Sequence, residues 1–188
     1  MISLFVDASL SYCNLAIIEN NKVLRHISIK TNNNLTDLIV EHIDELLNSA
    51  RLHQKDVKRL LIVIGPGSFT GIRVASTIAK TWNFVYQTPV YIINSLWLQL
   101  LTNDGISLID AKGGNWYVSG FKNNKLIIKP QMLNENSLKS ILSKHQELKI
   151  YKDYNNVDIF KNLLKHIDDF KLIKDIHKLT PLYIKKAL

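Results

Sequence analysis

The sequence predicts an α/β protein of two similar lobes, each a mixed sheet flanked by helices, with the second lobe reduced. The chain opens with three strand-like runs joined by short turns, and a second set of three begins near residue 105. Between the two sets, an apolar run at 60–64 leads into a glycine-rich turn and a helix, which is typical of a buried parallel strand. The loop cluster Thr102-Asn-Asp-Gly105 separates the sets. We therefore expect lobes at residues 1–102 and 103–188.

The composition excludes several classes of protein. With 188 residues, 46% of them hydrophobic, the chain can bury a core of its own. No window approaches the roughly 20 apolar residues of a membrane span, and the start lacks a basic signal-peptide region, so we expect a cytoplasmic protein with no membrane contact. The one cysteine, Cys13, lies in a strand-like run and is expected to be buried. The six histidines form no His-x-x-x-His pair, so we expect no metal site.

The formal charge of +8 is spread unevenly along the chain. Residues 1–102 carry +2 and residues 103–188 carry +6. A basic second half is compatible with a nucleic acid nearby. The excess consists mostly of dispersed lysines, with no cluster of aromatic residues and arginine on which bases could stack. We therefore do not expect the chain to read an RNA sequence directly.

The first three runs, 2–7, 12–19 and 23–30, are predicted to form an antiparallel meander. The first run ends in Asp7-Ala-Ser9, a carboxylate and a hydroxyl at a strand end that faces a hairpin. This arrangement resembles the first phosphate loop of actin, Hsp70 and the sugar kinases. The alternative is that Asp7 and Ser9 only hydrogen-bond the amides of the turn. The sequence leaves both interpretations open.

Two helices of the first half have more apolar surface than one sheet face requires. The first, 35–50, follows the capping residues Thr31-Asn-Asn-Asn34, and its apolar side chains cover an arc of about 200°. That is about twice the stripe needed to cover a sheet. The second, 71–86, has an apolar arc of about 160°. Either further layers of this chain cover the excess or a partner does.

The glycine-rich turn, Gly65-Pro-Gly-Ser-Phe-Thr-Gly-Ile-Arg73, has two interpretations. In one, the glycines only shape the turn and let the helix lie close to its neighbour. In the other, the N–H groups at the helix start bind phosphate. The candidate contacts would then be Gly65, Gly67, Ser68, Thr70, Gly71 and Arg73. The turn is not a Walker A loop, because Ile72 and Arg73 follow Gly71 where that loop needs Lys and Ser or Thr.

The remaining elements complete two lobes of similar order. We expect strands at 90–93, 106–110, 116–121, 126–129 and 148–151, and helices at 96–101, 135–146 and 156–167. A set of three strands followed by helices, which occurs twice along the chain, is the topology of the actin, Hsp70 and sugar-kinase (ASKHA) fold. No repeat is visible residue by residue.

The string from Gly65 to Arg73 also closely resembles the signature of the TsaB (YeaZ) family, bacterial partners of TsaD in making the threonylcarbamoyladenosine of tRNA. Shorter matches in the correct order support this resemblance. They are Leu4-Phe-Val-Asp-Ala-Ser9, Ile92-Ile-Asn-Ser-Leu96, Leu108-Ile-Asp-Ala-Lys-Gly113, Trp116-Tyr117 and Pro181-Leu-Tyr-Ile-Lys185.

The resemblance implies a subunit without catalytic residues. Such a protein binds a TsaD-type transferase and, with a TsaE-type ATPase, supports modification of the tRNA adenosine next to the anticodon. It implies no intrinsic cofactor, with the binding of ATP or ADP possible only in the complex, and it implies that tRNA is contacted indirectly. A homodimer of the isolated chain stays open. The TsaD contact of this family is built from its first two helices. The candidate interface residues are Leu35, Leu38, Ile39, Val40, His42, Ile43, Ala75, Ile78, Ala79 and Trp82.

Two independent enzyme classes are the alternatives. A small nucleotide-binding kinase or ATPase of the actin-like superfamily would need a set of metal-coordinating acids, and only Asp7 and Asp110 lie at suitable strand ends. A peptidase would need a nucleophile and a base, and Ser68 has no His or Asp partner marked in the sequence.

Overall fold

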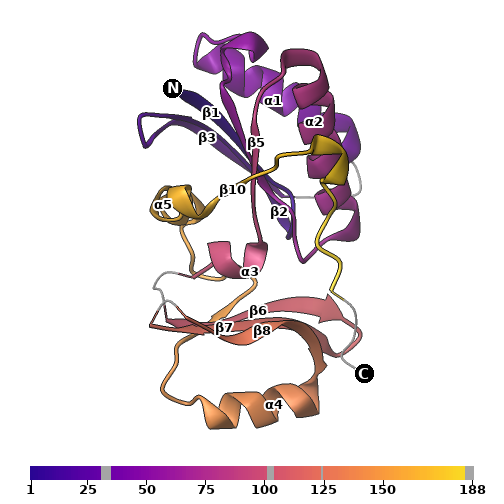
Figure 1. The fold of residues 1–188 in the computed structure, drawn as a ribbon, viewed down its shortest axis with the longest axis vertical. Helices are drawn as coiled ribbons and strands as arrows, with labels where there is room; N and C mark the ends of the chain where they lie inside the picture. The colour runs from indigo at the N-terminus through magenta and orange to yellow at the C-terminus, as the bar shows by residue number, and fades with distance from the viewer. Residues whose placement is uncertain (31–34, 101–103, 124, 185–188) are drawn as a thin grey trace.

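The computed structural model describes residues 1–30, 35–100, 104–123 and 125–184, which form two sheets with helices packed against them (Figure 1). Within these residues the first sheet has six strands in the order β10-β5-β4-β1-β2-β3. They are β1 (Ile2–Asp7), β2 (Tyr12–Glu19), β3 (Lys22–Lys30), β4 (Arg59–Val63), β5 (Val90–Ile93) and β10 (Lys171–Leu172).

The first three strands form the expected antiparallel meander, with β1 paired to β2 and β2 to β3. β4 then pairs in parallel with β1 on one side and with β5 on the other. Residues 60–63 of β4 are fully buried, because both faces of the sheet are covered. The predicted apolar central strand is thereby confirmed.

Helices cover both faces of the first sheet. On one face lie α1 (Leu35–Ser49) and α2 (Phe69–Tyr86), which contribute to the core that contains the β-strand residues Leu4 and Leu60. On the other face, α5 (Ile159–Lys165) and the 3-10 helix η2 (Ile167–Asp169) pack against Phe5 and its neighbours. Figure 1 shows these layers in the upper half of the molecule.

The second sheet has four strands in the described residues, in the order β8-β7-β6-β9. They are β6 (Gly105–Lys112), β7 (Asn115–Lys122), β8 (Lys125–Asn134) and β9 (Ile150–Lys152). Helix α4 (Glu135–Lys144) covers one face and shares a core with Ile106, Leu108 and Val118. The short α3 (Ser95–Leu98) contacts the sheet from the side of the first lobe (Figure 1).

The chain returns to the first sheet after β9. Helix α5, strand β10 and the 3-10 helix η3 (Ile176–Lys178) all pack there, and the amide of Leu182 donates to the carbonyl of Ile64 across 2.8 Å. The four-stranded sheet is therefore built from residues 105–152, while residues 159–182 cover the first sheet. The expected boundary near residue 102, with Thr102 and Asn103, lies outside the described residues, and the division at 102/103 stays a prediction.

The predicted fold class is confirmed, and most of the elements occur where they were expected. The expected strand 126–129 is longer in the structure, as β8, and the helix expected at 156–167 is shorter, as α5. The helix expected at 96–101 is a single turn, Ser95–Leu98. The capping residues at 31–34 lie outside the described residues. Two 3-10 segments, η1 (Gln54–Asp56) and η3, and the two-residue β10 were not expected.

Candidate functional site

The glycine loop connects β4 to α2 and lies directly against the turn after β1. The amide of Ser68 donates to the carbonyl of Ser9 across 2.7 Å, and the amide of Ser95 donates to the carbonyl of Gly65 across 2.9 Å. The Ser68 hydroxyl accepts from the Gly71 amide and caps α2. The loop thus uses its own polar groups to attach to neighbouring backbone.

The glycines at 67 and 71 are required by this close approach. A Cβ on Gly67 would lie 2.0 Å from the carbonyl oxygen of Ser9, and one on Gly71 would lie 1.8 Å from that of Ala8. Gly65 has a left-handed φ of 97°, which side chains rarely adopt. These contacts support the interpretation that the glycines shape the loop. They leave a nucleotide contact at Gly65, Gly67, Ser68, Thr70, Gly71 and Arg73 as a prediction.

Asp7 closes the turn against which the loop packs. Its Oδ1 accepts from both the amide and the hydroxyl of Ser9, at 2.9 and 2.6 Å, so this oxygen satisfies the turn as the second interpretation of the sequence expected. The Asp7 side chain is fully buried, and this burial raises its pKa. Burial likewise raises the pKa of the Cys13 thiol to about 12, which excludes a nucleophilic thiolate.

A cavity of about 830 Å³ lies between the two sheets and next to the glycine loop. Its walls come from the turn after β1, from β2 and β3, from the glycine loop, from the end of β6 and from the stretch after β9. The polar lining residues are Ser9, Ser11, Tyr12, Asn14, Ser28, Lys30, Ser68, Asp110, Lys112, Asp153, Tyr154 and Asn155.

The charged groups at the second-lobe wall of this cavity are already paired. Asp110 accepts from the Lys112 amide and ammonium, at 2.7 and 2.9 Å, and these bonds lower the pKa of the Asp110 carboxyl. The Asp110 amide in turn donates to Asp153 Oδ1. Across the described residues, no group of three His, Cys, Asp or Glu side chains could hold a metal ion.

Two buried polar atoms belong to residues at the cavity lining or next to it. Asp7 Oδ2 and the Tyr154 hydroxyl have no partner at hydrogen-bonding geometry within the described part of the chain. Burial, together with the nearby charge of Asp7, raises the pKa of Tyr154. Gln99 holds this region from the first lobe, since its side chain hydrogen-bonds Ser107, the Leu108 carbonyl and the Tyr154 amide. These contacts between the lobes therefore hold the backbone of Tyr154, which lines the cavity, in place.

The residues expected at the partner interface divide into two groups. Ile39, Ile43, Ala75, Ala79 and Trp82 lie in the core between the helices and the first sheet, at most 9% exposed. The apolar arcs of α1 and α2 are thus largely covered by the chain itself, and by the residues around η3 on the flank of α2.

The second group is accessible. Val40 on α1 is 57% exposed, and Leu38, His42 and Ile78 are half-buried. The side chain of Leu35 lies outside the described ones. The sequence analysis did not single out the end of α2, where Phe84 is 80% and Val85 58% exposed. The run of three consecutive apolar residues Phe84-Val-Tyr86 at the end of the helix was the signal that could have marked them.

A second set that sequence reasoning missed joins α2 to the end of the described chain. The Arg73 guanidinium lies 3.6 Å above the ring centre of Phe69, and its Nε donates to the Tyr183 hydroxyl across 2.8 Å. Tyr183 is 110 residues from Arg73 and 114 from Phe69 in sequence, so only the fold brings it to them.

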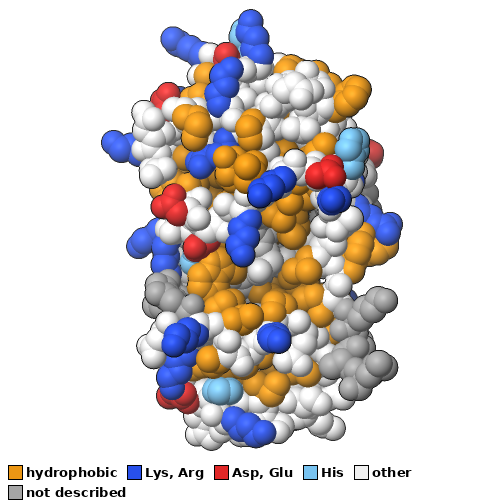
Figure 2. Space-filling model, in the orientation of Figure 1, with side chains coloured by type: hydrophobic (Ala, Val, Ile, Leu, Met, Phe, Trp, Pro, Cys, Tyr) orange, Lys and Arg blue, Asp and Glu red, His pale blue; other side chains and the backbone are white. Residues whose placement is uncertain are grey.

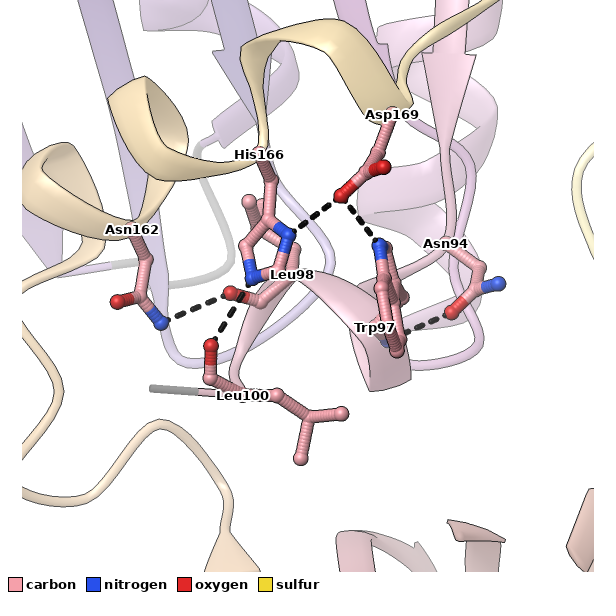
Figure 3. A network of polar contacts seen from close by, with 7 residues as sticks. All are labelled: Asn94, Trp97, Leu98, Leu100, Asn162, His166 and Asp169. Atoms are coloured by element: carbon pink, nitrogen blue, oxygen red, sulfur yellow. Dashed lines mark hydrogen bonds and ion pairs between the residues drawn. The ribbon is translucent and has the colours of Figure 1, made fainter. Parts of the chain in front are cut away.

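A polar network around the buried His166 ring joins α5 and η2 to α3 (Figure 3). The His166 ring lies between Asp169 Oδ2, at 2.7 Å from Nδ1, and the Leu100 carbonyl, at 2.9 Å from Nε2. The Trp97 indole donates to the same Asp169 oxygen across 2.8 Å, and its ring also contacts Phe121 of β7. This network links the segments that cover the first sheet to the second sheet.

Figure 2 shows hydrophobic side chains gathered around the middle of one face of the molecule, where the two sheets meet. No helix of the described chain is long and apolar enough to span a membrane. The accessible surfaces that remain as candidate sites are the cavity, the exposed apolar residues of α1 and α2, and the Phe69, Arg73 and Tyr183 set.

Comparison with known proteins assigns the family. The family model described as TsaD, tRNA N6-adenosine threonylcarbamoyltransferase, matches residues 23–152, which is most of the chain. The chain is 33% identical over 186 residues to protein MG208 of Mycoplasma genitalium, covering 97% of this chain and 94% of that protein.

Two further comparisons carry the TsaB and YeaZ names. The TsaB protein of Buchnera aphidicola from Acyrthosiphon pisum is 25% identical over 198 residues, covering 98% of this chain and 89% of that protein. The solved structure of YeaZ from Pseudomonas aeruginosa superposes with a TM-score of 0.70 at 14% identity, covering 97% of this chain and 99% of that one, which shows a shared fold. The chain therefore belongs to the TsaB (YeaZ) family, within the wider group of proteins that the TsaD model matches.

Proposed function

We propose that this protein is a non-catalytic subunit that binds a TsaD-type transferase and supports threonylcarbamoyl modification of the tRNA adenosine next to the anticodon. Relatives named as tRNA threonylcarbamoyladenosine biosynthesis proteins support the pathway. The observation that carries the role of a binding subunit is the exposed apolar surface on α1 and α2, where Val40, Phe84 and Val85 are each more than half exposed. Such a surface stabilises a complex when a partner covers it.

The proposed docking surface consists of these three residues together with Leu38, His42 and Ile78, which are half-buried residues of the same two helices. Both helices lie on the same face of the first sheet and contact one another, so their outer sides can meet a partner together (Figure 1). An aromatic side chain such as Phe84 is the kind of anchor that dominates protein interfaces. When the TsaD-type partner is absent, a second copy of this chain would cover the same surface.

The geometry around the glycine loop supports a role without catalysis. Ser68 is used as the cap of α2, Asp7 is buried with a raised pKa, and Cys13 is buried. The independent kinase or ATPase is not favoured, because its metal-binding acids would be Asp7 and Asp110, and Asp110 is already paired with Lys112. ATP or ADP would then act in the complex, together with a TsaE-type ATPase, and the site of action would be the cytoplasm.

Co-expression with the TsaD-type protein of the same organism tests this proposal. Affinity purification through a tag on the partner should retain this chain at a one-to-one ratio. When the mixture is supplied with a threonylcarbamoyl donor and the TsaE-type ATPase, it should modify an unmodified tRNA transcript only when both proteins are present. The isolated chain should hydrolyse ATP no faster than buffer. Failure to form the complex under conditions where both proteins are folded would contradict the proposal, and so would modification by the partner without this chain.

A further inference from the structure

The surface at the start of α2 holds three planar groups together in solvent. The Arg73 guanidinium lies 3.6 Å above the centre of the Phe69 ring and donates through Nε to the Tyr183 hydroxyl. The Phe69 and Tyr183 ring centres are 5.8 Å apart with an interplanar angle of 44°. Phe69 is 57% and Tyr183 49% exposed, so both rings keep open surface.

The charge of Arg73 is the second feature of this surface. Arg73 forms no ion pair in the described residues, and the sequence contains no Asp or Glu between Asp56 and Asp104. Lys80 lies about two turns further along α2 on the same side as Arg73. The potential of this surface is therefore positive, which favours an anionic ligand.

A cationic surface with exposed rings suits one class of ligand. Unpaired nucleobases stack on aromatic side chains and on guanidinium planes, and their phosphates are attracted to the same arginine. We propose that Phe69, Arg73 and Tyr183, the stacking platform, hold an unpaired base of an RNA strand. That this RNA is a tRNA rests on the proposed function, whereas the stacking of an unpaired base on the platform is independent of it.

The platform is separate from the proposed docking surface. Phe69 and Phe84 are exposed aromatic residues at opposite ends of the same helix, fifteen positions apart, or about 22 Å along its axis. Phe84 has no arginine partner in the described chain, and its neighbour Val85 is apolar. Charge thus distinguishes a surface for a nucleic acid from one for a protein on the same helix.

Fluorescence anisotropy of the full chain with a labelled anticodon stem–loop RNA tests the platform. Phe69→Ala should weaken binding by about 5- to 100-fold, the loss expected when one stacked base loses its ring. Arg73→Lys keeps the positive charge but loses the planar guanidinium group, so it should also weaken RNA binding. Phe84→Ala is the matched control and should bind the RNA like the wild type. A fully paired hairpin of the same length should compete poorly, because it offers no unpaired base.

Tyr183→Ala removes one ring of the platform without changing α2. It replaces Phe69→Ala as the test variant if Phe69→Ala does not fold. The proposal is overturned if the wild type does not bind the stem–loop, if Arg73→Lys binds as the wild type does, or if the paired hairpin competes equally. It is also overturned if Phe69→Ala loses the TsaD-type partner but not the RNA, which would identify a protein contact. Partner capture by Phe69→Ala and Phe84→Ala, measured alongside, tests the proposed function separately.

Discussion

The amide of Ser68 donates to the carbonyl oxygen of Ser9 across 2.7 Å, and this bond joins the loop before α2 to the turn after β1. A Cβ on Gly67 would lie 2.0 Å from that same oxygen. Loop and turn are therefore in contact through their backbones, and any side chain at position 67 must separate them.

Gly67→Ala is expected to lower the free energy of unfolding by about 1–3 kcal/mol, since overpacking and strain in a close contact cost this much. Urea unfolding followed by circular dichroism measures the change. Gly114→Asn is the control: Gly114 has a φ of 72°, which Asn tolerates, and no atom lies within 4 Å of its Cβ position. The control should stay within about 0.5 kcal/mol of the wild type.

The outcome also bears on the phosphate interpretation of the loop. Titration calorimetry of the isolated wild type with ATP and ADP should show no tight binding. Tight binding that Gly67→Ala or Ser68→Ala removes, at an unchanged melting temperature, would contradict the shape interpretation and support a phosphate site.

The raised pKa of Asp7 predicts that the stability of the fold depends on pH. Burial raises its pKa in the folded protein above 3.8, so the folded state binds the Asp7 proton more tightly than the unfolded state does. This contribution to stability is present at low pH and is lost as the pH rises from about 4 through the folded pKa. Asp7→Asn removes it, and should therefore become more stable relative to the wild type as the pH rises.

Chemical unfolding of the wild type and Asp7→Asn at several pH values between about 4 and 8 measures this difference. Asn retains the oxygen that accepts from the Ser9 amide and hydroxyl. A difference between the two proteins that is constant over the whole range would show that Asp7 does not titrate as proposed.

Charged substitutions on the docking surface should separate binding from folding. Val40→Asp and Phe84→Asp place a charge on exposed positions, so the monomer should fold with a change of less than about 1 kcal/mol while the partner is lost. Leu126→Asp is the matched control, because Leu126 is 47% exposed on β8 of the other sheet. Size-exclusion chromatography with the TsaD-type partner gives the readout.

Ile43→Asp provides the opposite comparison, since Ile43 is 2% exposed in the core and the variant should unfold. If Val40→Asp and Phe84→Asp also unfold, or if they bind the partner as well as Leu126→Asp does, the docking surface is wrongly placed.

His166 should contribute to stability through its two hydrogen bonds. Both partner atoms, Asp169 Oδ2 and the Leu100 carbonyl, are acceptors, so both bonds form together only when both ring nitrogens carry a proton. His166→Phe leaves the buried Leu100 oxygen unpaired and should cost about 1–3 kcal/mol. The near-ultraviolet circular dichroism of Trp97, which shares Asp169, should change as well.

The control for this variant is His177→Phe, because His177 is exposed on η3. It should leave both the stability and the near-ultraviolet spectrum unchanged. A stable His166→Phe variant with an unaltered spectrum would show that the network in Figure 3 does not hold α5 to α3.

Sequence patterns predicted the long, periodic elements well. The alternating runs of β1 and β2 and the apolar run of β4 are explicit in the sequence, and their ends lie close to the expected positions. Strand β10 could not be predicted, because two residues have no periodicity and it exists only through its pairing with β5. Sequence periodicity also did not predict the end of α5, where the chain passes through His166 into the 3-10 helix η2.

The candidate site was predictable only where it is local. The glycine loop and the Ser68 cap follow from a continuous string of residues. The widths of the apolar arcs on α1 and α2 did not reveal what covers them, and Trp82, expected as an interface anchor, lies 9% exposed in the core with Leu179. A segment from the far end of the chain supplies that cover, and no local pattern reports such a contact. The contact of Arg73 with Tyr183 is hidden in the same way.

The return of residues 159–182 to the first sheet has a consequence for how the protein is made on the ribosome. Phe5, Leu61 and Val63 face a layer formed by α5, η2 and Phe170, so this side of the first sheet stays uncovered until the second sheet has been translated. The nascent first lobe must therefore either remain incompletely folded or be protected during synthesis. Because its closing contacts are so distant in sequence, we expect slow, chain-length-dependent folding, with stable protection of β1 only after residue 170 has left the ribosomal tunnel.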